Sequence, residues 1–268
     1  MNNINRTFIE DPLRILRAIR QSCCFGFVIS AKTVKAITET ANRIEIISQE
    51  RITDEFNKIL MSANPVLGFV MLKDYGILDV IMPEVSEMYS HIRDRFERIT
   101  KSKYYTLETA LAVILNKNTI KVEQKNEILK KFKYSNDIIK EVSLYAENSC
   151  GIELASALKY DSKIREFAMM CGDQEHFNKL IAVAKAMNFI RKEDHLQYVY
   201  IVDDVEKMFG YKLPVDGNDI MDVLEIGPGP EIKNVLNMLM EEAYENPKIS
   251  KGTCMKLIKT YGKTMQKY

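Results

Sequence analysis

The stretch at residues 8–27 reads Phe-Ile-Glu-Asp-Pro-Leu-Arg-Ile-Leu-Arg-Ala-Ile-Arg-Gln-Ser-Cys-Cys-Phe-Gly-Phe. Its Asp11-Pro12 pair places a side chain that can cap a helix before a proline that suits the first helical position. Leu13, Leu16 and Ile19 then recur at the spacing of a single helix face. The stretch therefore predicts an amphipathic helix near the start of the chain.

Helix signals of the same kind continue along the chain. Ser30 and Ser48 can each cap a helix. Asn64-Pro65 can open the next one, and Gly76 can end it in a left-handed conformation. Further helices are predicted near residues 83–99, 106–116, 121–133, 135–147, 152–159, 161–171, 174–190, 195–209, 217–224, 229–245 and 250–265. Since apolar and polar residues do not alternate with a period of two over useful lengths, we predict an all-α chain.

The composition bounds the class of protein. Apolar residues make up 46% and charged residues 28% of the chain, which favours a soluble globular protein over a disordered one. The N-terminus has no apolar segment of a signal peptide, and no uncharged apolar run of about 18 residues predicts a membrane span. Five cysteines without a C-x-x-C pair indicate reduced thiols, so we expect a cytoplasmic protein that does not contact membranes.

Charge is unevenly distributed, although the formal net charge is only +1. Residues 248–268 hold six lysines and no acid, and residues 117–140 hold seven lysines against three acids. A chain with segregated charge can present a basic face to a polyanion even when its total charge is near zero.

Several motifs resemble one family and follow one another in that family's order. Residues 8–27 resemble the E-D-x-x-R, L-R-A-I-R and F-G-F motifs of the class II tRNA nucleotidyltransferase and poly(A) polymerase family. Residues 48–60 resemble its E-R-I-x-x-E-x-x-K-I-L helix, and residues 64–84 its N-P-x-x-G run. Similarity continues at residues 134–142, 213–221 and 227–232. The resemblance covers the family's C-terminal neck, body and tail, without its catalytic head.

The resemblance implies an elongated arrangement of helices in three parts. We assign residues 1–97 to a neck that carries the base-recognition helix, residues 98–209 to a helical body and residues 210–268 to a helical tail. Polar residues at 98–105 and turn residues at 210–218 mark the two predicted joints. By the same resemblance, the chain is the part of a CCA-adding enzyme that selects CTP or ATP and holds the acceptor and elbow arm of tRNA.

Asp11 and Arg14 lie three residues apart, so on a helix they share one face. A carboxylate accepts hydrogen bonds and a guanidinium donates them. Cytosine and adenine offer an amino donor beside a ring-nitrogen acceptor, which this pair can match. Uracil and guanine place a carbonyl where the amino group would be. The resemblance implies this role for Asp11 and Arg14, and Arg17, one turn further on, can meet the triphosphate or brace Asp11.

The same residues also have plainer interpretations. Asp11 can simply cap the helix, and the arginines can form a solvated face. Interior side chains, or mutual pairing of Asp11 and Arg14 without a cleft beside them, would leave only a helical scaffold. Residues expected to support the motif, in a mainly architectural role, are Glu10, Glu50, Arg51, Glu55 and Lys58.

Two features of the family are missing from the sequence. No Gly-Ser stretch followed by D-x-D occurs, so we predict no catalytic residue and no metal site, and we expect magnesium only with a separate head domain. Asn116-Lys117 stands where many bacterial relatives carry the His-Asp of a phosphohydrolase. The chain is thus expected to be an expressed domain, a truncation or one half of a split enzyme, and whether it counts as an enzyme is left open.

Two groups of lysines are candidates for RNA contact, since phosphate contacts give affinity without sequence preference. The body group and the tail group together comprise Lys121, Lys125, Lys130, Lys131, Lys251, Lys256, Lys259 and Lys263, with Lys267 beyond them. The alternative is a solvated helix face. Two other functions also stay open: the RNA-binding part of a poly(A) polymerase relative, and a non-catalytic helical scaffold.

Overall fold

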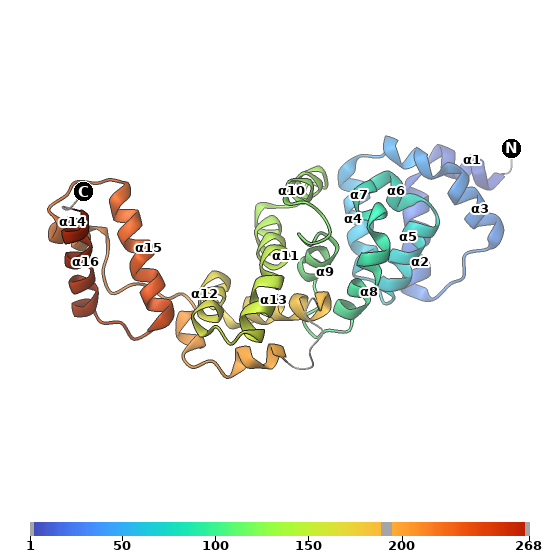
Figure 1. Cartoon of the computed structure of the whole chain (residues 1–268). Helices are drawn as coiled ribbons and strands as arrows, with labels where there is room; N and C mark the ends of the chain where they lie inside the picture. Colours follow the sequence, from blue (N-terminus) through green and yellow to red (C-terminus); the bar gives the residue numbers. More distant parts are fainter. Residues whose placement is uncertain (1–2, 189–194, 266–268) are drawn as a thin grey trace. The chain divides into compact units, whose positions relative to one another are not determined.

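The computed structural model describes residues 3–188 and 195–265, and these form helices and turns with no strand (Figure 1). The predicted all-α fold is confirmed. The helices are α1 (Asn3–Glu10), α2 (Leu13–Phe25), α3 (Ala31–Thr40), α4 (Gln49–Leu60), α5 (Pro65–Asp74), α6 (Ile77–Ile81), α7 (Pro83–Glu87), α8 (Tyr89–Thr100), α9 (Leu107–Ile114), α10 (Val122–Lys131), α11 (Asn136–Ala157), α12 (Asp161–Cys171), α13 (Gln174–Met187), α14 (Gly217–Leu224), α15 (Pro230–Glu245) and α16 (Lys251–Met265). Three 3-10 segments accompany them, η1 (Ala41–Ile46), η2 (His195–Tyr200) and η3 (Val205–Met208).

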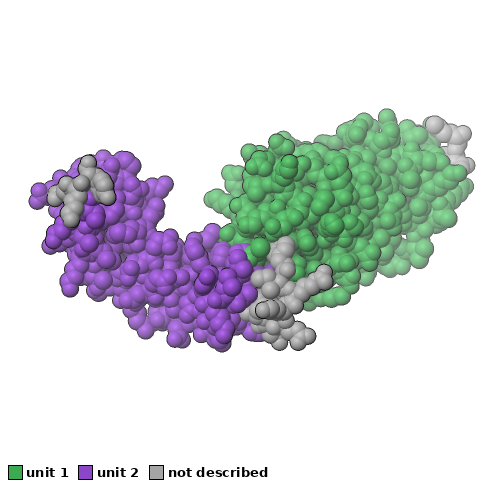
Figure 2. Space-filling view, viewed as in Figure 1, with its two compact units in different colours: residues 1–150, 179–189 green, residues 151–178, 190–268 purple. Residues whose placement is uncertain are grey.

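The chain divides into two compact units (Figure 2). Unit 1 contains residues 1–150 and 179–189, and unit 2 contains residues 151–178 and 190–268. Both α11 and α13 therefore contribute residues to both units. The division into neck, body and tail at residues 97 and 209 is a different partition, based on family motifs, and it stays a prediction.

In unit 1, the apolar stripe of α2 packs against α4 and α5. Leu16 and Ile19 of α2 are fully buried, as is Ile59 of α4. Gly68 lets α5 approach both helices, because a Cβ there would lie 2.4 Å from Ile59 Cγ2 and 3.0 Å from Cys23 Sγ. The glycine of the N-P-x-x-G run thus serves close packing, which holds α2 firmly in place.

Asn116 illustrates how a buried polar side chain fastens the body of unit 1. Its Nδ2 donates to Ala146 O at 3.1 Å and to Ser149 Oγ at 3.0 Å, while its Oδ1 accepts from Asn118 N at 3.1 Å. The side chain is fully buried, so these bonds satisfy groups that would otherwise be costly to desolvate. Asn116 is therefore a structural residue of this chain.

In unit 2, the helices α14, α15 and α16 surround a small apolar core of their own (orange to red in Figure 1). The core includes Ile220, Leu239 and Ile258, one from each helix. Elsewhere in unit 2, the buried Arg165 of α12 donates to Tyr244 O at 3.0 Å and to Glu245 O at 3.2 Å. The guanidinium therefore satisfies carbonyl groups at the C-terminal end of α15, where a cation is favoured.

Most predicted helices are present, and two of the predicted caps can be checked directly. Ser30 Oγ accepts from Thr33 N at 3.2 Å at the start of α3. Gly76 has a φ of +75°, in the left-handed region as predicted. Ser48 precedes α4, but its side chain makes no capping hydrogen bond.

Three predicted boundaries are wrong. A break between residues 147 and 152 was predicted, whereas α11 runs unbroken through Gly151. A Cβ at Gly151 would lie 2.7 Å from Phe167 Cζ, so this glycine serves close packing rather than a helix end. Residues 83–99 form the two helices α7 and α8. Residues 195–209 form the segments η2 and η3 instead of one helix, because Asp204 between them adopts a φ of +61°.

Candidate functional site

The junction between α1 and α2 places Asp11 at the start of the predicted recognition helix. Asp11 N donates to Thr7 O at 3.2 Å, and Arg14 N donates to Asp11 O at 3.1 Å, so the backbone turns from one helix directly into the next. No side-chain hydrogen bond caps α2. The capping interpretation of Asp11 is therefore wrong, and its carboxylate remains available for another role.

Asp11 and Arg14 lie side by side at the surface of unit 1. Arg14 Nε donates to Asp11 Oδ2 at 3.3 Å, and the two side chains are 54% and 30% exposed, respectively. Of the two conditions that would leave only a scaffold, the first does not hold, because the side chains are not interior; of the second, the mutual pairing is present. The distance is long for a charged pair. It also engages only one edge of the guanidinium and one carboxylate oxygen, which leaves the remaining donors and acceptor for a base.

The next two arginines of α2 converge on one buried carboxylate. Arg17 Nε lies 3.2 Å from Glu55 Oε1, and Arg20 Nε lies 2.7 Å from Glu55 Oε2. The Glu55 side chain is only 4% exposed. A buried carboxylate with two guanidinium donors fixes the rotation of α2 against α4, which turns Asp11 and Arg14 outward. Arg17 therefore braces α4 rather than Asp11.

The other support residues contribute less to this arrangement. Lys58 pairs with Asp54 on the outer face of α4 at 2.5 Å, and Glu10 pairs with Arg6 on α1 at 2.8 Å. Glu50 and Arg51 are exposed and make no side-chain hydrogen bond or ion pair with the described residues. Of the residues predicted to support the motif, Glu55 is the one that links α4 to α2.

The body lysines do not all share the predicted role. Lys125 is fully buried, where its ammonium pairs with Glu147 and donates to Ser143 Oγ at 2.9 Å. An ammonium held in this way cannot meet an RNA phosphate, so the prediction for Lys125 is wrong. The exposed members of the group are Lys121, Lys130 and Lys131, of which Lys131 also donates to Ile81 O at 3.1 Å. Their contact with RNA stays a prediction.

Among the tail lysines, Lys251 differs from the other three. Its Nζ lies 2.7 Å from Asp219 Oδ1, and this hydrogen bond is the main reason that the pKa of Asp219 is lowered. Lys256, Lys259 and Lys263 are exposed, and their spacing of three and four residues aligns them along one face of α16. Lys267 lies outside the described residues.

Unit 2 contains a cavity in the tail and a second cavity near α13, and neither was predicted from the sequence. The tail cavity, of about 470 Å³, is lined by Val223, Leu224, Glu225, Ile226, Glu231, Lys259, Gly262 and Lys263. The turn formed by Gly227-Pro228-Gly229-Pro230 is the one signal that marked this region.

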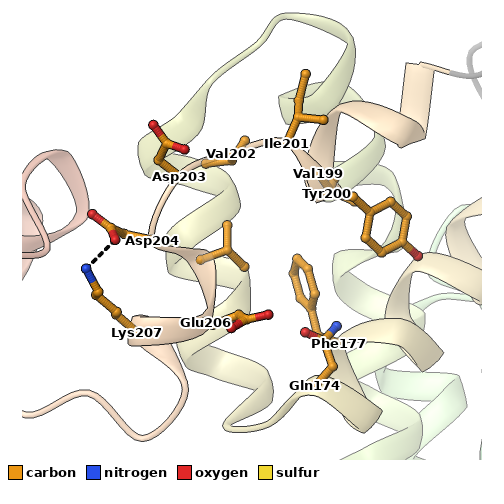
Figure 3. Close-up of a pocket in the computed structure, with 11 residues that line it drawn as sticks. Gln174, Phe177, Val199, Tyr200, Ile201, Val202, Asp203, Asp204, Glu206 and Lys207 are labelled. Carbon is orange, nitrogen blue, oxygen red and sulfur yellow. Dashed lines mark ion pairs between the residues drawn. The ribbon is translucent and has the colours of Figure 1, made fainter.

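The second cavity, of about 320 Å³, lies between the start of α13 and the residues from η2 to η3 (Figure 3). Phe177 and Glu206 point into it, whereas Asp204 turns away toward Lys207 (Figure 3). Asp204 also pairs with Lys248 at 3.2 Å, and these lysines lower its pKa. Since Asp204 has two cationic partners, it belongs to the structure of this turn.

No group of three or more His, Cys, Asp or Glu side chains in residues 3–188 and 195–265 is arranged to hold a metal ion. None of the helices in the same ranges combines the length and the apolar character needed to cross a bilayer.

Two family models match the sequence. Residues 26–89 match a model described as a probable RNA- and SrmB-binding site of polymerase A. Residues 103–247, more than half of the chain, match a model described as a putative domain 2 of tRNA nucleotidyltransferase.

Among known proteins, CCA-adding enzymes are similar in sequence. The enzyme of Pediococcus pentosaceus is 28% identical over 240 residues, which cover 87% of this chain and 55% of that protein. The enzyme of Lactococcus lactis subsp. lactis is 27% identical over 241 residues, with coverage of 89% and 56%. The chain thus spans about half the length of the curated relatives it matches.

Solved structures of such enzymes share the fold. The Bacillus stearothermophilus CCA-adding enzyme in complex with CTP has a TM-score of 0.78 at 18% identity, over 99% of this chain and 65% of that one. The Thermotoga maritima CCA-adding enzyme complexed with tRNA has a TM-score of 0.58 at 15% identity, over 96% and 62%. At these identities the likeness concerns the fold.

Proposed function

The chain belongs to the tRNA nucleotidyltransferase family, and we propose that it is the RNA- and nucleotide-binding portion of a CCA-adding enzyme. The observation that carries this proposal is the pair formed by Asp11 and Arg14 at the exposed start of α2. Neither group caps the helix or lies in the interior. A donor and an acceptor in this position form a surface that a nucleotide base can pair with.

The pair selects C and A by hydrogen bonding rather than by shape, because U and G would leave its polar groups without partners. The free oxygen of Asp11 accepts from the amino group of cytosine or adenine, and the terminal nitrogens of Arg14 donate to the adjacent ring nitrogen. Uracil or guanine would bring a carbonyl oxygen toward the carboxylate. Such a mismatch leaves the protein's polar groups unpaired, which is the strongest way to reject a close analogue.

The arrangement below the pair keeps it in place. Glu55 binds Arg17 and Arg20 from the buried side of α2, so the helix cannot rotate without breaking both contacts. A base site needs this rigidity, because an acceptor and a donor discriminate only when their separation matches the edge of the base. We infer that the task of Glu55 in this chain is to position the recognition helix.

tRNA, CTP and ATP are the proposed partners, and the exposed lysines are the proposed phosphate contacts. Relatives in solved structures are described in complex with tRNA, with CTP and with ATP. The chain spans about half the length of its curated relatives, and we propose that catalysis depends on a head domain outside these 268 residues, which would bring the magnesium ion.

The proposal is tested by nucleotide and RNA binding to the chain. Titrations followed by NMR should show CTP and ATP perturbing the start of α2 more than UTP or GTP does. Asp11→Ala and Arg14→Ala should each weaken CTP binding about ten-fold, which corresponds to the loss of one hydrogen-bonded contact with a charged group. Arg6→Ala removes a cation of α1 and should change nothing. Equal binding of all four nucleotides by the wild-type chain would overturn the proposal.

A poly(A) polymerase relative is the second candidate, because the model that matches residues 26–89 is described for polymerase A. This candidate also uses a base site on α2, but it adds only A. A head domain supplied in trans would separate the two: incorporation of C followed by A supports the CCA-adding function, and incorporation of A alone supports the alternative. In the case of a scaffold, neither variant of α2 would alter binding.

A further inference from the structure

The tail cavity combines an apolar wall with unpaired charges. Its wall is formed by Val223 and Leu224 at the end of α14 and by Ile226 just beyond it, and Gly262 of α16 contributes no side chain. Its volume of about 470 Å³ is within the usual range of sites for small organic ligands. The cavity is therefore large enough for more than a single ion.

Two cations and two carboxylates border this wall. Lys259 and Lys263 are one turn apart on α16, while Glu225 and Glu231 come from the ends of α14 and α15. Within the described part of the chain, none of these four side chains takes part in an ion pair. In contrast, Lys251 at the start of α16 is paired with Asp219. The lysines at the cavity thus retain their capacity to bind an anion.

Backbone geometry fixes the cavity at both sides. Glu225 ends α14 with a φ of +54°, a conformation in which glycine or asparagine is usual. The turn is closed by a hydrogen bond from Ile226 N to Met221 O at 3.2 Å, which directs the chain across the cavity. On the other side, a Cβ at Gly262 would lie 2.6 Å from Leu224 Cδ2, so a side chain there would have to displace this wall.

These features match the parts of a nucleotide. A base has two apolar faces, which suit an aliphatic wall, and a polar edge whose amino groups can donate to a carboxylate. A phosphate binds between ammonium groups. A bare phosphate would leave the apolar wall without a partner, and an apolar ligand would leave the lysines without one.

We propose that the tail cavity binds one unstacked nucleotide of the RNA partner, with its base on Val223, Leu224 and Ile226 and its phosphate between Lys259 and Lys263. This inference rests on the proposed function, because it takes the partner to be RNA. The tail then does more than attract the phosphate backbone: it recognises a place where the RNA exposes a base.

The test uses one variant that fills the cavity and another that removes its positive charge. Ile226 lines the cavity but is not packed against the core of the tail, so Ile226→Trp fills the space at small cost to the fold. The doubly substituted chain Lys259→Gln/Lys263→Gln removes the phosphate contacts. A matched control, Lys233→Gln/Lys256→Gln, removes the same charge from exposed positions outside the cavity.

Dissociation constants are measured for tRNA and for a fully paired RNA duplex, with circular dichroism as the check on folding. We expect Ile226→Trp to weaken tRNA binding about five-fold with an unchanged salt dependence, and the cavity lysine pair to weaken it about ten-fold, more than the control pair. Duplex binding should be insensitive to Ile226→Trp, because a duplex exposes no unstacked base.

Three outcomes would contradict the proposed nucleotide site or the proposed function on which it rests. If Ile226→Trp binds tRNA like the wild type and the two lysine pairs have equal effects, the cavity is not a nucleotide site and its lysines are ordinary phosphate contacts. An equal effect of Ile226→Trp on tRNA and duplex also overturns the base site. If the wild-type chain does not prefer tRNA over heparin, the proposed function itself fails, which is distinguishable because it does not involve any variant.

Discussion

The recognition helix α2 and the helix α16 both carry rows of cations, but the two rows differ in their ion-pair partners. On α2, Arg17 and Arg20 share the buried carboxylate of Glu55, which is only 4% exposed. On α16, Lys256 is exposed and has no ion-pair partner within the described residues. The arginines of α2 bound by Glu55 therefore define a geometry, whereas a lysine such as Lys256, outside the tail cavity and unpaired, supplies mainly an electrostatic potential.

This difference assigns separate tasks to the two regions. Reading a base requires groups fixed to within a fraction of an ångström, and α2 obtains this from Glu55. Holding a long polyanion requires charge but tolerates mobile side chains, and α16 offers such charge. Substitutions on α2 should thus affect stability and selectivity together, and those of the unpaired lysines of α16 should affect RNA affinity alone.

Removal of Glu55 should have the largest effect. Glu55→Ala leaves two guanidinium groups, one of them only 28% exposed, without their shared acceptor. We expect the free energy of unfolding to fall by about 3 kcal/mol, measured by urea denaturation, together with loss of the preference for CTP and ATP.

Asp54→Ala is the matched control, on the same helix. It breaks the exposed pair of Asp54 with Lys58, and should cost no more than about 0.5 kcal/mol. Equal destabilisation by the two substitutions would show that Glu55 has no special structural role, and the contrast between α2 and α16 would then lose its basis.

Lys125 provides the second test, because the sequence grouped it with exposed lysines. Lys125→Ala removes a fully buried ammonium and its apolar stem, and leaves Glu147 without its partner. We expect a loss of about 2 kcal/mol in unfolding free energy and an unchanged salt dependence of RNA binding.

Lys130→Ala, five residues further on and exposed, should show the opposite pattern: unchanged stability and a weaker dependence of RNA affinity on salt. If the thermal midpoint of Lys125→Ala equals that of the wild type, the buried pair does not stabilise unit 1, and the role of Lys125 must be assigned again.

The sequence predicted helices well where local signals agree with packing. Ser30 caps α3 as expected, and Gly76 adopts the left-handed conformation, because both effects depend only on residues close by in the sequence. The predicted break between residues 147 and 152, where Gly151 lies, is wrong. The proximity of Phe167 explains that glycine, and a contact between residues 16 positions apart on different helices leaves no local signal.

In the candidate site, too, the features with a sequence motif were predicted and those that depend on packing were not. The motif placed Asp11, Arg14 and Glu55 in one region, and the structure brings α2 and α4 together there. What the sequence could not give is the burial of individual lysines, since Lys125 and Lys130 look alike in a charge pattern but face opposite sides of α10. The tail cavity was missed because its lining comes from three helices.

A smaller effect than those on stability is expected for two lysines of α16, Lys256 and Lys251, in the salt dependence of RNA binding. Lys256→Gln removes an exposed cation, so the slope of log K against log salt should decrease by about 0.7–0.9 and affinity should fall a few-fold. Lys251→Gln should change the slope less, since this ammonium is already paired with Asp219. Identical slopes for the two variants, measured by filter binding, would mean that RNA competes successfully with Asp219.

The smallest effect concerns the pH dependence of that pair. The hydrogen bond from Lys251 is the first cause that lowers the pKa of Asp219, and the same bond raises the pKa of Lys251. A lowered carboxyl pKa contributes stability above the unfolded value of 3.8, and this contribution is lost as the pH falls through the folded value. A raised lysine pKa contributes stability below the unfolded value of 10.5, and this contribution is lost as the pH rises through the folded value.

The difference in melting temperature between the wild type and Lys251→Gln should therefore be constant from about pH 5 to 9 and shrink outside this window. Lys256→Gln should show no such window, because no carboxylate in the described chain pairs with Lys256. A difference for Lys251→Gln that changes steadily between pH 5 and 9 would mean that a group other than Asp219 holds this lysine.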